Sequence, residues 1–170
     1  MRKLVLAFLV VLGSTAVMAQ SKVGHVNSQK LLDTLPSRKV AIEKLKEFEM
    51  SGVKELQEME ADFNAALSKY EQNRANMSPV IQKIEEEKLM KKNQAIQERE
   101  QSLTQEMQIY SQELNKPILD RVQKSVELVA DRKKLNYVID ESVTLYFKGG
   151  TDITQEVLVE LLRMDAESMK

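Results

Sequence analysis

The fold is decided by residues 38–116, which read RKVAIEKLKEFEMSGVKELQEMEADFNAALSKYEQNRANMSPVIQKIEEEKLMKKNQAIQEREQSLTQEMQIYSQELNK. This run contains one glycine, Gly52, and one proline, Pro79. Glycine and proline are the residues that disfavour helix most strongly, so their scarcity predicts helix almost throughout. The polar stretch 73–79 interrupts the run. The pattern therefore predicts two long helices folded back on each other, with the tip near 73–79.

The apolar residues of both predicted helices recur with helical spacing. We expect the first helix from about Ser37 to about Gln72, and the second from Pro79 with Ser78 as its N-cap. At ~1.5 Å per residue each limb is roughly 55 Å long, and equal limbs suit an antiparallel hairpin. The expected seam positions lie three or four residues apart in the first helix and seven apart in the second: Leu56, Met59, Phe63, Ala66 and Tyr70, then Leu89, Ile96, Leu103 and Tyr110.

Residues 1–19 have the features of a secretory signal peptide. Arg2 and Lys3 supply positive charge, residues 4–12 are apolar, and small residues lead up to Ala19, after which we expect cleavage. The apolar run is shorter than the ~20 residues that a membrane span needs. The chain has no cysteine, so disulfides and a lipidated cysteine after the cleavage site are excluded. We therefore expect an exported, soluble protein without a membrane anchor.

The two ends of the mature chain, residues 20–36 and 117–170, carry the strand signals. Residues 22–27 alternate apolar and polar side chains, and Ser28 is the expected cap of a short helix. Pro117 is expected to kink the second long helix where the arm, residues 37–116, joins the body. Further strands are expected at 137–140 and 143–147. A closing helix should then run from 155 to about 162, followed by a frayed tail at 163–170.

These elements define an α+β fold that is mostly α, in which a long antiparallel helical hairpin projects from a small β body. Short strands with open edges bury little apolar surface, so a single copy of this body is marginal. Pairing with other copies would complete the sheet, which predicts a homo-oligomer. The residues expected in this oligomeric body are Val23, Val26, Val138, Ile139, Leu145 and Phe147.

No catalytic signature is present. His25 is the only histidine and lies in a predicted strand, where a packing role is expected, and without cysteine a zinc site is not predicted. Gly149-Gly150 lacks the Lys-Ser/Thr pair of a phosphate-binding loop. The run at 85–87 (EEE) indicates a solvated helix face, because consecutive helical residues point in different directions. Mixed charges with a net charge of −1 argue against nucleic-acid binding. We expect no enzyme activity, no cofactor and no metal.

Several short sequences keep a fixed order around the predicted hairpin. They are residues 23–30 (VGHVNSQK) after the signal peptide, 117–118 (PI) followed by 129–130 (VA), 137–140 (YVID), and 152–154 (DIT) before the last helix. In this order they resemble the Skp/OmpH family of periplasmic chaperones over essentially the whole mature chain. The resemblance implies a homotrimer with a shared β-barrel-like body and three helical arms around a cavity. That cavity would hold unfolded outer-membrane proteins on their way to the outer membrane, without nucleotide.

One property departs from the family pattern. Well-known members are strongly basic, whereas residues 38–116 of this chain carry 13 basic and 15 acidic side chains. A lipopolysaccharide site is therefore not carried over to this sequence. The near balance of charge indicates that clients would be held more by apolar contacts than by a positive field.

Unfolded clients vary in sequence, so a protein that holds them needs adaptable apolar contacts. Methionine suits this role because its unbranched thioether side chain repacks easily. Each arm candidate can instead fill the seam between the two helices, and the sequence leaves both roles open. The candidate client-binding residues are Met50, Val53, Leu56, Met59, Phe63, Met90 and Met107.

The sequence gives less support to two other functions. A structural coiled-coil spacer of the cell envelope would need a sustained heptad pattern and usually an anchor. Here the heptad is interrupted at Glu49 and Gly52 and no anchor is found. An enzyme or metal carrier is supported by nothing in the sequence.

Overall fold

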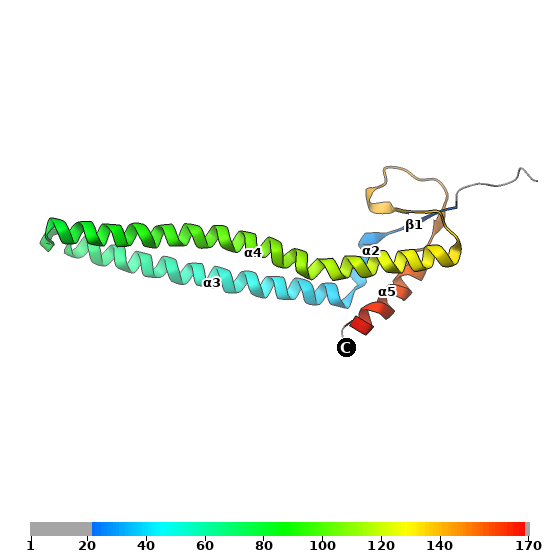
Figure 1. The fold of residues 1–170 in the computed structure, drawn as a ribbon, viewed down its shortest axis with the longest axis horizontal. Coiled ribbons are helices and arrows are strands. Elements are labelled where there is room, and N and C mark those ends of the chain that lie inside the picture. The colour runs from blue at the N-terminus through cyan, green and yellow to red at the C-terminus, as the bar shows by residue number, and fades with distance from the viewer. Residues whose placement is uncertain (1–21, 169–170) are drawn as a thin grey trace, which may run out of the picture.

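The computed structural model describes residues 22–168, and the predicted signal peptide at 1–19 lies outside the described residues. Two long helices form a hairpin that extends from a cluster of shorter elements (Figure 1). The chain order is β1 (Val23–Val26), α2 (Ser28–Thr34), α3 (Pro36–Asn73), the 3-10 turn η2 (Arg74–Asn76), α4 (Pro79–Lys133), β2 (Tyr137–Asp140), the 3-10 turn η3 (Glu141–Val143), β3 (Thr151–Asp152) and α5 (Thr154–Ser168). The predicted α+β fold with a helical hairpin is confirmed.

The hairpin begins and turns where the sequence predicts. Pro36 occupies the first turn of α3, where its missing N–H has no helical partner to lose. At the tip, the Ser78 hydroxyl accepts a hydrogen bond from the Ile81 backbone N–H at 3.4 Å, and Pro79 follows at the first helical position. The predicted helix limits at 37, 72 and 79 therefore agree with the observed ones to within one residue.

A close approach of backbone and side chain fixes how α3 and α4 pack. Leu103 of α4 lies over Gly52 of α3, and a Cβ at Gly52 would be 2.3 Å from Leu103 Cδ1. Phe48 and Tyr110 also meet across the seam, with ring centroids 5.1 Å apart. Gly52, which the sequence indicated only as a weak interruption of the helix, is thus a contact point.

Polar bridges run along the same seam. Arg99 of α4 donates from Nε to Glu55 Oε2 of α3 at 2.9 Å and from Nη1 to Glu106 at 3.1 Å. Hydrogen bonds from Ser102 and Arg99 hold the pKa of Glu106 below its usual value. Nearer the tip, the Tyr70 hydroxyl donates to Glu86, and this hydrogen bond raises the pKa of Tyr70. Ion pairs, hydrogen bonds and apolar contacts therefore all join the two limbs.

The sheet is parallel, with the order β2-β1-β3. Val23–Val26 pairs in register with Tyr137–Asp140, and Gly24-His25 pairs with Thr151-Asp152. A parallel pair needs a crossover connection, and the whole arm serves as the crossover between β1 and β2. Strands that are distant in sequence therefore meet only when the hairpin has returned to the body.

The apolar core lies where α2, α4 and α5 pack beside the sheet. Its most deeply buried apolar side chains come from three separate segments of the chain, listed in order: Leu31, Leu35, Val129, Ile153, Val157 and Leu161. Gly24 of β1 lies close to this core, and a Cβ there would be 2.6 Å from Leu135 Cδ1. The body therefore carries the most deeply buried apolar groups of the described chain.

The expected strand at 143–147 does not form. The Asp140 carboxylate accepts from the Ser142 N–H at 3.0 Å, and the Asp140 carbonyl accepts from Thr144 Oγ1 at 2.7 Å. These bonds turn the chain into η3, and the third strand is Thr151–Asp152 instead. Strand propensity mostly measures packing against neighbouring strands. Within one chain, 143–147 has no such neighbour, so its β-rich composition does not produce a strand.

Two local predictions also need correction. The cap of α2 is Asn27 rather than Ser28, because Asn27 Oδ1 accepts from the Lys30 N–H at 2.9 Å. The tail is not frayed from 163 onwards, since α5 continues to Ser168. Asp165 explains this second difference: its side chain is only 1% exposed and binds Arg121 and Ser37, which pins the end of α5 to the root of the arm.

Pro117 lies inside α4, which continues through it to Lys133. Figure 1 shows α4 changing direction as it passes from the arm to the body. A proline inside a helix removes one backbone hydrogen bond and favours a bend. The helix ends at Lys133, and the next residue, Lys134, caps its end in a left-handed conformation with φ of 54°.

Candidate binding surfaces

The structure separates the candidate client-binding residues into two groups. Met50, Val53 and Met90 are exposed, with 62%, 42% and 65% of their surface accessible. Their side chains are not used by the seam, so they remain free to contact another molecule. These three side chains therefore point to solvent, which was one of the two positions that the sequence left open.

The other candidates lie at or beside the helix–helix seam. Leu56, Met59, Phe63 and Met107 are half-buried. A half-buried side chain in a two-helix seam contributes to holding the limbs together and leaves only part of its surface for a client. For these four residues both roles of the sequence analysis persist, with packing as the larger share.

A shallow groove accompanies the exposed pair on α3. Met50 and Val53 lie beside Lys46, Glu49, Lys54 and Gln57 around a hollow of about 540 Å³. The groove has apolar side chains at its centre and charges of both signs around it. Such a surface accepts an apolar side chain of a client whether the client residues beside it are positively or negatively charged.

Sequence reasoning missed several exposed apolar residues on the arm. Because α4 is long and its helical stripe was assigned wholly to the seam, residues on its other faces were not singled out. The exposed arm residues not singled out are Val40 and Ile42 on α3, and Val80, Ile81, Ile84 and Ile109 on α4. A helical-wheel count of apolar residues outside the seam stripe would have found them.

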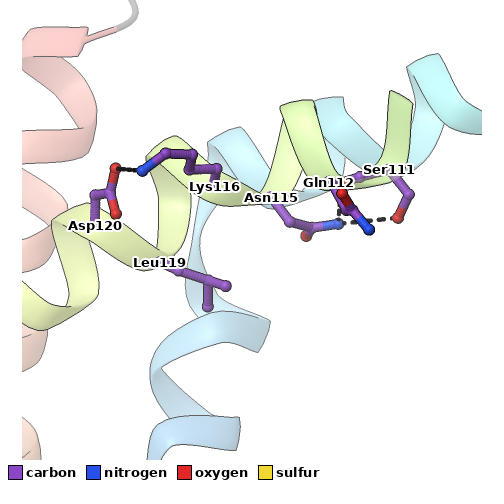
Figure 2. A pocket seen from close by; sticks show the side chains of 6 residues that line it. All are labelled: Ser111, Gln112, Asn115, Lys116, Leu119 and Asp120. Atoms are coloured by element: carbon purple, nitrogen blue, oxygen red, sulfur yellow. Dashed lines mark hydrogen bonds and ion pairs between the residues drawn. The ribbon is translucent and has the colours of Figure 1, made fainter. Parts of the chain in front are cut away.

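A further hollow of about 340 Å³ lies on the outer side of α4, lined by Ser111, Gln112, Asn115, Lys116, Leu119 and Asp120. Figure 2 shows that most of its polar residues are paired along the helix. Lys116 pairs with Asp120 at 3.0 Å, and Asn115 donates to the Ser111 carbonyl at 2.7 Å. With these groups paired, Leu119 is the part of this hollow available for an apolar contact.

At the root of the arm, three elements meet around a polar cluster. Arg121 of α4 donates from Nη2 to Asp165 Oδ1 at 3.0 Å and to Ser37 Oγ at 2.9 Å. The Ser37 N–H donates to Asp165 Oδ2 at 3.1 Å. An adjoining cavity of about 590 Å³ is lined by apolar residues of α3 and α4 together with Lys44 and Arg121. This cluster sets the direction in which the arm leaves the body.

The residues predicted for an oligomeric body also divide. Val26 is buried in the core, while Val23 and Val138 are half-buried. Ile139, Leu145 and Phe147 are exposed in the single chain. Their exposed neighbours, which sequence reasoning did not name, are Tyr137, Val143 and Tyr146. An exposed apolar surface therefore extends from β2 across η3 and into the loop that follows.

The strand ends also bring together groups that could hold a metal ion. His25, Glu141 and Asp152 place one ligand atom each within 4.8 Å of one another. Hydrogen bonds from Thr154 hold the pKa of Asp152 below its usual value. Among the residues that the structure describes, no helix has the length and apolar character needed to cross a membrane.

The chain is an α+β protein in which a long antiparallel helical hairpin is inserted between the strands of a small parallel sheet. The family model described as "Outer membrane protein (OmpH-like)" matches residues 22–161. The chain therefore belongs to the OmpH-like family, as its sequence motifs predicted.

Named relatives and a solved structure agree with this family. The chaperone protein Skp of Photorhabdus laumondii is 27% identical over 148 residues, covering 87% of this chain and 90% of that protein. The Skp of Pectobacterium atrosepticum is 29% identical over 154 residues, covering 90% and 93%. An OmpH-like structure from Caulobacter crescentus superposes with a TM-score of 0.73 at 17% identity, covering 91% of this chain and 89% of that one. This last likeness concerns the fold alone.

Proposed function

We propose that the protein is an ATP-independent holdase chaperone that binds unfolded outer-membrane proteins in the periplasm and prevents their aggregation in transit to the outer membrane. The observation that carries this proposal is the set of exposed apolar side chains on the arm, above all Met50, Val53 and Met90. The relatives named as Skp chaperones support it. Export to the periplasm follows from the predicted signal peptide at 1–19.

Each contact of this kind is weak by itself. Burying one such side chain contributes at most about 1.5–3 kcal/mol, and part of that is lost in ordering the client. Several contacts on one client must therefore act together, which raises their effective concentration without any new chemistry. As a client folds elsewhere, it buries its own apolar side chains and loses its contacts with the arm one by one. Release therefore needs no nucleotide.

We further propose that residues 20–36 and 117–170 form the body of a homotrimer and that residues 37–116 form its arms. Support comes from the exposed apolar surface around β2 and from the outer edge of β2, which pairs with no strand of the described chain. Exposed edges and apolar patches of this kind favour association between chains. Analytical ultracentrifugation of the mature protein tests the assembly. A trimer is expected, whereas a monomer or a parallel rod would favour a spacer.

The holdase proposal is tested by diluting a denatured outer-membrane β-barrel protein into buffer that contains the mature protein and no ATP. Light scattering should be suppressed when the trimer is in excess. The triple variant Met50→Ser, Val53→Ser, Met90→Ser should suppress it less, because the exposed apolar contacts are gone. A matched control, Gln97→Ser, Gln101→Ser, Gln105→Ser, changes exposed polar positions of the same arm and should behave like the wild type. No suppression by the wild type would overturn the proposal.

A further inference from the structure

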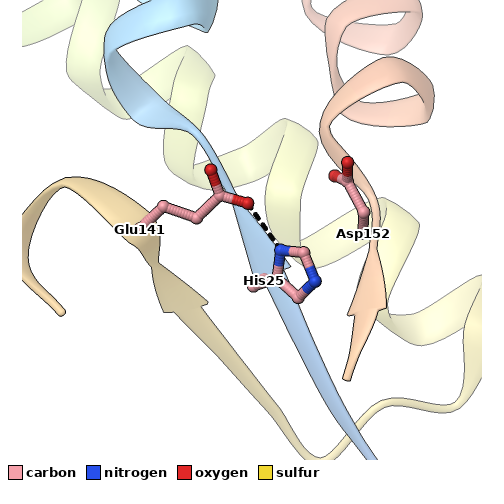
Figure 3. Close-up of side chains that lie close together, drawn as sticks. All are labelled: His25, Glu141 and Asp152. Atoms are coloured by element: carbon pink, nitrogen blue, oxygen red, sulfur yellow. Dashed lines mark hydrogen bonds and ion pairs between the residues drawn. The ribbon is translucent and has the colours of Figure 1, made fainter. Parts of the chain in front are cut away.

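The sole histidine lies at a meeting point of three chain segments. His25 is in the central strand β1, Glu141 opens η3 after one neighbouring strand, and Asp152 lies in the other neighbour, β3. Figure 3 shows the imidazole ring between the two carboxylates, with Glu141 on one side and Asp152 on the other. His25 Nδ1 lies 2.6 Å from Glu141 Oε1, and the three ligand atoms fall within 4.8 Å of one another. The sheet register therefore brings the nitrogen donor of His25 to two oxygen donors that lie more than 100 residues further along the chain.

The two carboxylates lack the usual charge partners. Within residues 22–168, neither Glu141 nor Asp152 forms an ion pair with a lysine or arginine, and His25 is the only basic group paired with Glu141. The His25 and Glu141 side chains are partly sheltered, at 15% and 22% exposed, while Asp152 lies at the exposed side of the cluster. Two carboxylates beside one imidazole concentrate negative charge, and a bound cation would be attracted to both of them.

Surrounding groups hold each donor in place. Asn27 Nδ2 donates to Glu141 Oε2 at 3.2 Å, which leaves Oε1 directed at the imidazole. The Thr154 N–H donates to Asp152 Oδ1 at 2.8 Å. The Phe147 ring packs against the imidazole with centroids 4.8 Å apart. Hydrogen bonds that orient carboxylate ligands are a regular feature of protein metal sites.

We propose that His25, Glu141 and Asp152 bind one Zn²⁺ ion per chain. One imidazole nitrogen and two carboxylate oxygens are a suitable donor set for zinc, and a water molecule would complete a tetrahedral site. Zinc binding replaces the hydrogen bond between His25 Nδ1 and Glu141: the neutral imidazole would bind through Nδ1 with its remaining proton on Nε2, and any further proton passes to solvent. Small side-chain rotations bring the carboxylate oxygens to bonding distance. The bound ion joins β1, η3 and β3 and so secures the loop at 144–150.

Counting ligand residues in the sequence could not reveal this site. A single histidine without cysteine predicts no zinc centre, and the two carboxylates stand near 116 and 127 residues further along the chain. Only the parallel pairing of β1 with both β2 and β3 brings them together. The inference does not depend on the chaperone proposal, because it concerns the body and not the arm.

The single histidine makes the test direct. The mature, tag-free, ¹⁵N-labelled protein is treated with chelator, dialysed and titrated with Zn²⁺ while the imidazole nitrogen resonances of His25 are followed by NMR. A saturable shift of the Nδ1 resonance that ends at one equivalent per chain is expected, together with a higher unfolding temperature. His25 resonances that do not respond to a tenfold excess of zinc would overturn the proposal.

Three variants locate the ion. Glu141→Gln and Asp152→Asn keep the size of the side chains and an oxygen for the neighbouring hydrogen bonds, and each should weaken zinc binding by at least about tenfold. Glu113→Gln alters an exposed carboxylate on the arm and should leave binding unchanged. If both site variants are folded by circular dichroism and bind zinc as tightly as the wild type, the assigned ligands are wrong. If a site variant does not fold, the wild-type titration alone decides between the two outcomes.

Discussion

The arm and the body are built on opposite principles. In the body, Leu31, Ile153 and Leu161 have no exposed surface, whereas seam residues of the arm such as Ile96 and Leu103 keep 8% exposure. The body has contacts between segments that are distant in sequence, and the arm is one pair of helices with solvent on every other side (Figure 1). A thin seam opens more easily than a closed core. The arm can therefore adapt to a client while the body keeps its shape.

The largest effect should come from the core of the body. Leu161→Ala removes a fully buried side chain and should lower the free energy of unfolding by about 2–5 kcal/mol. For a chain of this size that corresponds to a fall in Tm of roughly 5–15 °C in thermal denaturation. The control Val159→Ala changes an exposed residue of the same helix and should stay within about 0.5 kcal/mol of the wild type. Equal losses in the two variants would refute the assigned core.

A smaller effect is expected at the closest approach within the arm. Gly52→Ala gains roughly 1 kcal/mol of helix propensity but forces a Cβ against Leu103, and overpacking costs about 1–3 kcal/mol. We expect net destabilisation that is confined to the arm, seen as faster amide hydrogen exchange along α3 and α4. In a Leu103→Ala background the obstacle is absent, so the same change should stabilise. If Gly52→Ala stabilises the wild type as well, the packing of Leu103 on Gly52 is wrong.

The tip should respond more locally still. Ser78→Ala removes the N-cap of α4 and should cost about 1 kcal/mol of local stability. Amides 80–82 should exchange faster while the global Tm changes little, because the tip makes few contacts with the rest of the chain. Ser68→Ala, an exposed position inside α3 away from any helix N-terminus, is the control. A large fall in Tm from Ser78→Ala would show that the arm and body unfold together.

The smallest expected effect is a change of thermal stability with pH. Hydrogen bonds from Arg163 and Arg132 lower the pKa of Glu160 below its usual value of 4.5. A lowered pKa in the folded state stabilises the protein above the unfolded pKa, and this contribution is lost as pH falls through the folded value. The Tm difference between wild type and Glu160→Gln should therefore be positive at pH 6 and shrink below pH 4.5. A difference that is constant between pH 6 and pH 3 would contradict this.

The sequence predicted the arm more accurately than the body, for a physical reason. Helix limits, the Ser78 cap and the tip depend on local propensities and on contacts within one hairpin. The strand expected at 143–147 and the cap at Ser28 failed because the local hydrogen bonds of Asp140 and Asn27 were not foreseen. The frayed tail failed because partners elsewhere in the fold hold the end of α5. Asp165 is the clearest case, since its partners Arg121 and Ser37 are 44 and 128 residues away.

The candidate site was only half predictable. Helical spacing could identify which residues are apolar, but the assignment of each to the seam or to solvent needed the packed pair of helices. Met50 and Val53 proved exposed, while Met59 and Phe63 lie at the seam, although all four share one apolar helix pattern. For Met90 the same distinction depends on the rotation of α4 relative to α3, which no local pattern encodes.

The central claim is that the exposed apolar residues of the arm, rather than the surface of the body, contact clients. Site-specific photocrosslinking tests it most directly, with a photoreactive amino acid placed at Met90 on the arm or at Val159 on the body, both exposed. In cells that produce outer-membrane proteins, the account predicts client crosslinks from position 90 and few from position 159. Crosslinks that form mainly from 159, or equally from both positions, would contradict it.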